Sequence, residues 1–178
     1  MVFKSSFESV EVSMKQDKSY FEEVYRANYQ RVIRICRGYV SGDEDLAKDL
    51  TQEVFIKVWE SLASFRNESN IATWIYRITV NTCMLQFRKK KFFKQDNALQ
   101  GLSNSEEEND TAQENQLNKM YQCVDKLTQD NKAIILLELE GLPQKEIAAV
   151  MGISHEAIRV RVHRIKTSLT KCVQNGKI

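Results

Sequence analysis

The sequence predicts an all-α protein. It contains one proline, Pro143, and six glycines in 178 residues, so few positions break a helix. Apolar residues recur at helical spacing through most of the chain, with no internal repeat and no alternation typical of strands. One polar and acidic stretch interrupts this pattern. We therefore predict two small helical domains joined by a flexible acidic linker, with a helix-turn-helix in the C-terminal domain.

The expected organisation follows from these pattern changes. The domain boundaries are 1–18 for an irregular leader, 19–93 for the N-terminal domain, 94–116 for the linker and 117–175 for the C-terminal domain. Within the N-terminal domain the spacing predicts helices over 20–40, 43–64 and 70–91, with Asp43 as a cap for the second. The C-terminal domain is expected to hold helices over 117–127 and 131–140 before the helix-turn-helix.

Composition excludes several classes of protein. A hydrophobic fraction of 42% allows real cores, and a formal charge of +2 says little about partners. The cysteines form no C-x-x-C pair, which favours reduced thiols over a disulfide framework or a zinc site: Cys36, Cys83, Cys123 and Cys172. His155 and His163 would lie about 12 Å apart along one helix, too far to share a metal. We expect no metal, cofactor or catalytic residue.

The N-terminal residues contain no apolar core of a signal peptide, and no apolar run approaches the length of a membrane helix. We therefore expect a soluble, cytoplasmic chain without membrane insertion. Charge is unevenly distributed, with basic residues clustered over 88–94 and 159–171 and acidic ones over 106–114. Two separated basic surfaces indicate two contacts with a polyanion, although solvated helix faces would give the same pattern.

The second expected helix has two distinct faces. Its apolar stripe consists of Leu46, Leu50, Val54, Val58 and Leu62. A different face, within about 100° on the helical wheel, carries Asp49, Gln52, Glu53 and Ile56. An acidic surface with an exposed isoleucine suits a partner helix with basic residues. A solvated helix face is the alternative, and a nuclease-like carboxylate pair would lack a third acidic ligand, a histidine and a phosphate-binding loop.

The third expected helix also carries two rows. Its core stripe is Ile71, Ile75, Ile78, Thr82 and Leu85, and a quarter-turn away lies a row of Trp74, Arg77, Asn81 and Arg88. Aromatic rings stack on bases, amides pair with base edges and arginines meet phosphates, so this row could hold an unpaired DNA strand. Phe65 could add a second apolar wall. Trp74 and Phe65 could equally be ordinary core residues.

The segment from Leu142 to Leu169 has the pattern of a helix-turn-helix. Gly152 falls where the first helix must stop, at a position that often needs a positive φ, and Ser154 is a natural cap for the next helix. The second helix has a core stripe of Ile158, Val162, Ile165 and Leu169. Its other side includes Glu156, Arg159, Val160 and His163, where such motifs contact base edges. An ordinary helical hairpin is the alternative.

Three segments together resemble the bacterial RNA polymerase sigma factors, specifically the small two-domain extracytoplasmic-function (ECF) type. They are DLTQEVFIKVWESLASFR, TWIYRITVNTC and GLPQKEIAAVMGISHEAIRVRVHRIKTSL, in that order along the chain. The resemblance covers about residues 20–93 and 117–172. It departs from the family at Leu142 and Pro143, where a Ser or Thr cap is commoner, so we expect a weaker cap there.

The resemblance implies roles for the surfaces described above. The acidic face, Asp49, Gln52, Glu53 and Ile56, would bind the β′ clamp helices of core RNA polymerase. The minus-ten promoter element would be read and opened by Phe65, Arg66, Trp74, Arg77, Asn81 and Arg88, with Phe65 and Asn81 lining a pocket for a flipped base. The minus-thirty-five element would meet Ser154, His155, Glu156, Arg159 and His163, with Arg161, Arg164 and Lys166 on phosphates.

Further partners follow from the same resemblance: the β flap of core polymerase, promoter DNA and an anti-sigma factor, with no small-molecule substrate. The linker would thread the RNA-exit path. Two other classes of function remain open on the residues alone. One is a stand-alone helix-turn-helix regulator, which has no need of the Asp49 surface. The other is a nucleic-acid enzyme with Asp49 and Glu53 as catalytic carboxylates.

Overall fold

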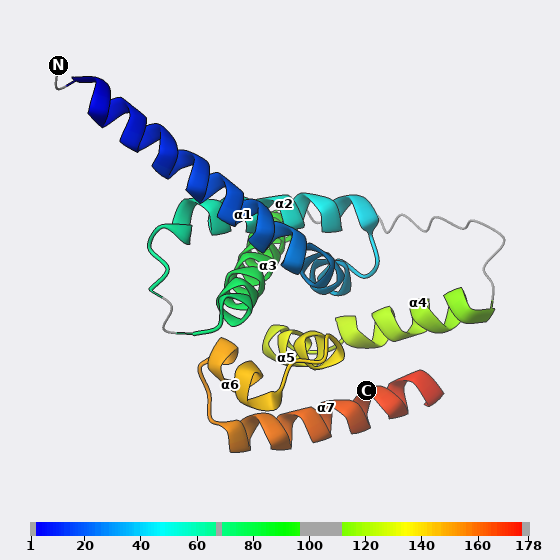
Figure 1. Cartoon of the computed structure of the whole chain (residues 1–178). Helices are drawn as coiled ribbons and strands as arrows, with labels where there is room; N and C mark the ends of the chain where they lie inside the picture. The colour runs from blue at the N-terminus through cyan, green and yellow to red at the C-terminus, as the bar shows by residue number, and fades with distance from the viewer. Residues whose placement is uncertain (1–2, 67–68, 97–111, 176–178) are drawn as a thin grey trace.

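The protein is folded entirely into α-helices within the part that the structure describes. The computed structural model describes residues 3–66, 69–96 and 112–175. The helices in these ranges are α1 Phe3–Tyr39, α2 Glu44–Leu62, α3 Ile71–Asp96, α4 Ala112–Asp125, α5 Gln129–Leu139, α6 Gln144–Met151 and α7 His155–Asn175 (Figure 1). The all-α prediction is confirmed.

Helices α1, α2 and α3 pack together as an N-terminal unit. Side chains in its core include Val32, Ile35, Val54, Val58 and Ile75, which are almost fully buried. Asp43 caps α2 as predicted, since its Oδ1 accepts a hydrogen bond from the Leu46 backbone N–H at 3.0 Å. The turn before it places Ser41 and Gly42 at φ values of 61° and 94°.

Both ends of this unit differ from the sequence-based boundaries. The expectation of an irregular leader is wrong for residues 3–18, because α1 begins at Phe3 and its N-terminal part projects away from the other helices (Figure 1). No glycine precedes Gly38 and no proline precedes Pro143, so nothing in the leader breaks a helix. Likewise α3 continues to Asp96 and α4 starts at Ala112. Of the expected linker, residues 97–111 lie outside the described residues.

Two of the predicted core stripes are correct only in their middle parts. Leu50, Val54 and Val58 are buried in α2, but Leu46 is exposed. In α3, Ile75 and Thr82 are buried, whereas Leu85 is exposed near the far part of the helix. A helix buries its stripe only where a neighbouring helix crosses it, and periodicity does not reveal where that crossing ends.

Helices α4 to α7 form a C-terminal unit around Ile134, Leu137, Ile147, Ile158 and Val162. A disulfide between Cys123 and Cys172 joins α4 to α7, so the expectation of four reduced thiols is wrong for this pair. The two residues are 49 positions apart, and only the packing of α4 on α7 brings their Cα atoms to 5.9 Å. Cys36 and Cys83 are free and buried, with their sulfur atoms 3.9 Å apart.

The two units are packed against each other. α3 contacts α6, and α1 contacts both α4 and α5 (Figure 1). The burial pattern of α5 shows the reason, because six consecutive residues, 132–137, are all buried. A surface helix buries one stripe, whereas a helix buried on all sides is enclosed by neighbours. Here α6 and α7 cover one side of α5, and α1 of the N-terminal unit covers another.

Candidate functional site

The acidic face of α2 is a real surface of the folded chain. Asp49 and Gln52 are exposed, Glu53 is half-buried, and Ile56 retains 57% of its accessible surface. The Glu53 carboxylate accepts hydrogen bonds from Lys57 Nζ at 2.7 Å and from Gln86 Nε2 at 2.6 Å. These two contacts hold Glu53 in one orientation, while the neighbouring face stays open to a partner.

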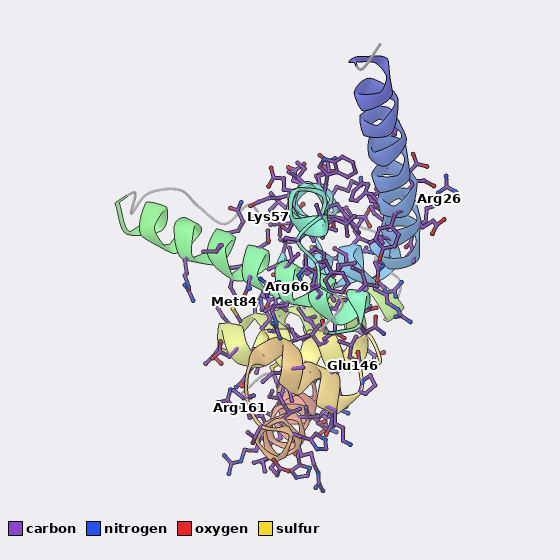
Figure 2. The ribbon with its side chains drawn as sticks, turned by 60° about the vertical axis from the view of Figure 1, so that its left-hand side comes forward. Arg26, Lys57, Arg66, Met84, Glu146 and Arg161 are labelled. Carbon is purple, nitrogen blue, oxygen red and sulfur yellow. A yellow bond between two sulfur atoms is a disulfide. The ribbon has the colours of Figure 1, made fainter. Side chains whose placement is uncertain are left out.

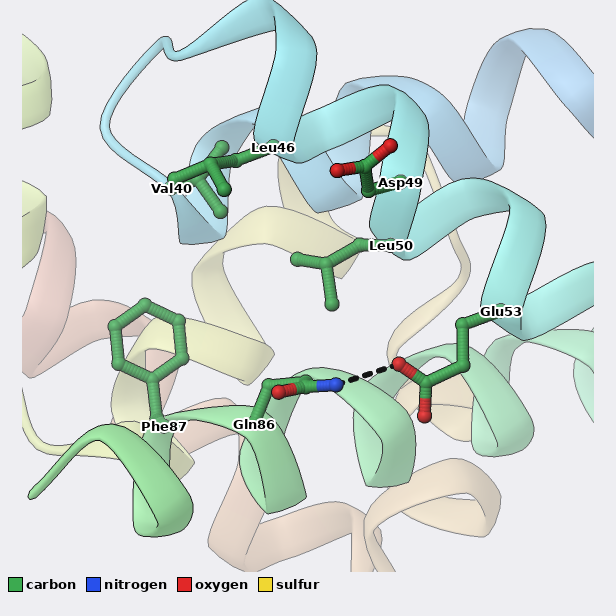
Figure 3. Close-up of a pocket in the computed structure, with 7 residues that line it drawn as sticks. All are labelled: Val40, Leu46, Asp49, Leu50, Glu53, Gln86 and Phe87. Carbon is green, nitrogen blue, oxygen red and sulfur yellow. Dashed lines mark hydrogen bonds between the residues drawn. The ribbon is translucent and has the colours of Figure 1, made fainter. Parts of the chain in front are cut away.

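A cavity that sequence reasoning missed lies beside this face. It has a volume of about 220 Å³ and its apolar walls come from Val40, Leu46, Leu50 and Phe87 (Figure 3). Asp49 and Glu53 stand at its α2 side, and Gln86 bridges to Glu53 below (Figure 3). The sequence carried no signal for it, because Phe87 reaches the cavity from α3.

Aromatic side chains continue the exposed surface along α1 and α2. Trp59 is 46% exposed and packs edge-on against Phe21, with ring centroids 5.0 Å apart. Tyr25 packs on Phe55 at 4.6 Å and is itself exposed. Burial raises the pKa of the Tyr25 hydroxyl, and the nearby Tyr29 adds to this effect. Trp59 follows Ile56 by three residues, a spacing from which its place on the same side of α2 could have been inferred.

The row on α3 lies outside the core, as predicted. Arg77, Asn81 and Arg88 are exposed, and Arg66 is exposed at the end of the preceding segment. The rings of Phe65 and Trp74 lie 5.0 Å apart at an interplanar angle of 39°. Both rings are half-buried, so they are neither free nor sealed in the core. The side chains of the basic run after Arg88, and residues 67–68 of the loop, lie outside the described residues.

Part of this row contacts the C-terminal unit. Arg77 Nη2 donates a hydrogen bond to the Ala149 carbonyl oxygen at 2.6 Å, and Thr73 Oγ1 donates one to Glu146 Oε2 at 2.9 Å. Both acceptors belong to α6, the first helix of the helix-turn-helix. Figure 2 shows Glu146 near α3 and Arg161 farther away on α7. This contact between the two units had no signal in the sequence.

The helix-turn-helix has the predicted local geometry. Gly152 ends α6 in the left-handed region at φ 67°, and Ser154 Oγ accepts a hydrogen bond from the Ala157 N–H at 3.2 Å. Pro143 starts α6 without a side-chain cap, and the helix still forms, as expected for proline at this position. The four stripe residues of α7 are buried: Ile158, Val162, Ile165 and Leu169.

The residues expected to face DNA lie on the outer side of α7. Glu156, Arg159, Val160 and His163 are exposed, and His155 is half-buried. Arg161, Arg164 and Lys166 are also exposed, with Lys166 paired to Glu138 at 2.7 Å. A wide concavity between α7 and the start of α5 is bordered by Arg161, Arg164 and Lys126. Cationic groups around a concavity attract a polyanion.

Two structural searches bear on other functions. In the described ranges, no group of three or more His, Cys, Asp or Glu side chains could hold a metal ion. None of the helices in those same ranges is both long and apolar enough to cross a membrane.

Family models match both units of the chain. The model of sigma-70 region 2 matches residues 24–93, and a model of sigma-70 region 4 matches residues 117–169. The class of protein is therefore that of the sigma-70 proteins. The ECF RNA polymerase sigma-E factor of Escherichia coli K12 is 33% identical over 181 residues, covering 93% of this chain and 92% of the relative. The chain belongs to the ECF RNA polymerase sigma factors, which direct promoter-specific transcription initiation.

Solved structures show the same fold. CnrH, in complex with the cytosolic domain of CnrY, aligns with a TM-score of 0.67 at 20% identity, covering 88% of this chain and 89% of that one. RpoE of Bartonella quintana, in complex with the anti-sigma factor NepR, aligns with a TM-score of 0.66 at 22% identity and covers 86% and 98%. Both similarities support the all-α, two-unit architecture.

Proposed function

We propose a division of labour among the surfaces of this sigma factor, which acts as a non-enzymatic subunit in the cytoplasm. The unit over residues 19–93 binds core polymerase through α2 and captures the minus-ten strand on α3. The unit over residues 117–175 reads the minus-thirty-five element with α7. The observation that carries this proposal is the exposed face of α2, where Ile56 stands bare beside Asp49 and Gln52.

The α2 face supports a protein partner with a basic and apolar surface. An exposed isoleucine contributes hydrophobic contact area, while Asp49 supplies charge complementarity and speeds encounter. We propose the β′ clamp helices as this partner. Glu53 is held by Lys57 and Gln86, which supports a structural place in a protein-binding surface over a pair of catalytic carboxylates with Asp49. A stand-alone regulator would have no use for this face.

The α3 row supports capture of an unpaired strand. Two half-buried rings, Phe65 and Trp74, lie next to an exposed amide, Asn81, on the next turns of the helix. Flipping a base costs a few kcal/mol, which stacking on one or two rings of this kind can offset. Arg66 and Arg88 would meet phosphates on either side.

The C-terminal unit supports two contacts. The exposed Arg159 and His163 stand where the second helix of a helix-turn-helix meets base edges, while Arg161 and Arg164 border the basic concavity. A second, mostly apolar groove runs between α4, α5 and α7, beside Leu139, which is 55% exposed. We propose the β flap of core polymerase as its occupant.

We also propose control by an anti-sigma factor. The structural neighbour RpoE of Bartonella quintana is bound to such a protein. A partner that covers α2 or α3 would exclude polymerase or DNA from the same surface. The chain itself does not identify this partner.

Reconstitution tests the proposal directly. The purified chain is mixed with core RNA polymerase, and specific initiation is measured on supercoiled promoter DNA. We expect Asp49→Arg to weaken core binding at least about tenfold, because it reverses charge at the centre of the face. Glu44→Arg, the same charge change on another side of α2, is the matched control. A chain that binds core without choosing start sites would refute the division of labour, and intact core binding by Asp49→Arg would refute the α2 assignment.

A further inference from the structure

We propose that the C-terminal unit acts as a built-in competitor for promoter DNA, closing over α3 until the polymerase separates the two units. This inference rests on the proposed role of α3 in strand capture. Its starting point is Arg77, whose guanidinium group donates to the Ala149 carbonyl oxygen at 2.6 Å. The nearby Thr73–Glu146 hydrogen bond ties the same part of α3 to α6. A DNA strand at Arg77 would therefore have to displace α6.

A second contact holds the two units together away from the DNA surface. Arg34 on α1 forms a bidentate pair with Glu140, through Nε at 2.9 Å and Nη2 at 2.7 Å. The Glu140 side chain is only 10% exposed, so this pair is partly shielded from water, while Arg34 remains 54% exposed. Such fork-shaped pairs are among the stronger charged contacts and demand a defined geometry. The pair forms only when α1 lies against the end of α5.

A buried lysine makes the closure reversible. Lys132 of α5 is 1% exposed and lies 5.2 Å from the ring centroid of Phe87 in the N-terminal unit. Its ammonium group donates to the Tyr39 carbonyl oxygen at 3.4 Å and pairs with Asp125. Removing an ammonium group from water is costly even when it is paired. Separation of the units returns Lys132 to water, which offsets part of the energy lost at the Arg34–Glu140 pair.

These contacts define two states with different exposed surfaces. In the closed state Arg77 and Thr73 are engaged by α6, and the two DNA-reading units cannot span separate promoter elements. In the open state α3 and α6 are both free. Because the Asp49 face lies on α2, polymerase could bind the closed chain first and then select the open state.

Charge reversal and restoration test the closure in the full-length chain. The variants are Glu140→Arg, Arg34→Glu with Glu140→Arg, and the control Glu44→Arg, which breaks the 2.7 Å Arg37–Glu44 pair within the N-terminal unit. The readouts are the radius of gyration by small-angle scattering and the affinity for fluorescent single-stranded minus-ten DNA from a promoter opened in the reconstituted reaction. Circular dichroism checks that each variant is folded.

We expect Glu140→Arg to enlarge the radius of gyration and to raise the affinity of the free chain for that DNA about fivefold. The double variant should return both values toward the wild type, and Glu44→Arg should leave them unchanged. Initiation by the holoenzyme should be unaffected, because the units are already apart. The closure is refuted if Glu140→Arg matches the wild type, if the double variant fails to restore it, or if the control behaves alike. Failure of wild-type initiation would instead refute the proposed function.

Discussion

Gly38 of α1 lies directly against Leu136 of α5, with no room for a side chain between them. A Cβ atom placed on Gly38 would be 2.2 Å from Leu136 Cδ2 and 3.0 Å from its Cδ1. Glycine in mid-helix normally costs about 1 kcal/mol relative to alanine, so its presence here needs a reason. The close approach of the two units at this point supplies one.

Gly38→Ala should therefore loosen the contact between the units while strengthening α1 itself. We expect a larger radius of gyration, together with unchanged or greater helix content by circular dichroism. Leu136 is buried, so it has little space into which to retreat. Ser19→Ala, on an exposed part of the same helix, is the control for helix propensity alone. A Gly38→Ala chain as compact as the wild type would show that Leu136 yields easily.

Trp74→Ala should impair promoter opening more than promoter binding. Loss of one stacking ring is expected to slow open-complex formation about tenfold, because a base on an aromatic ring is stabilised by about 1–3 kcal/mol. Permanganate reactivity of unpaired thymines measures opening, and a duplex minus-thirty-five fragment measures the remaining affinity. Trp74→Phe keeps a ring next to Phe65 and should retain most of the activity. Equal defects in both variants would point to a packing role for Trp74.

Arg159→Ala should relax base selectivity at a single position of the minus-thirty-five element. The expected loss is about 1–3 kcal/mol of discrimination at that position, measured by titration of duplexes with single substitutions. Arg164→Ala, at the edge of the basic concavity, should instead weaken all sequences alike and reduce the salt dependence. A uniform loss for Arg159→Ala would make this residue a phosphate contact.

The turn of the helix-turn-helix should depend on Gly152. Alanine at φ 67° is strained, so Gly152→Ala should lower the free energy of unfolding of the C-terminal unit by about 1–2 kcal/mol. Space is not the cause, since no atom lies within 4 Å of the added Cβ. Thermal denaturation of the full chain measures the change, and Gly152→Asn should cost less because asparagine tolerates the left-handed region. Identical melting curves for all three proteins would contradict this account.

Local features of the site were predictable because each depends on residues a few positions apart. The turn at Gly152, the cap at Ser154 and the buried stripe from Ile158 onward follow from backbone conformation and helical periodicity, and the structure confirms all three. The same reasoning placed Asp49, Gln52 and Ile56 on one open face of α2. It failed at residues 3–18, where composition suggested an irregular segment but nothing prevented a helix.

By itself, then, the order of residues determined the helices, their caps and which side of each faces water, since these depend on interactions within one or two turns. Only the tertiary structure decided which distant residues meet. It joined Cys123 to Cys172, set Gly38 against Leu136 and brought Arg77 to α6. Each of these contacts requires two helices to cross at a particular point, and periodicity specifies the face of a helix but not the partner that covers it.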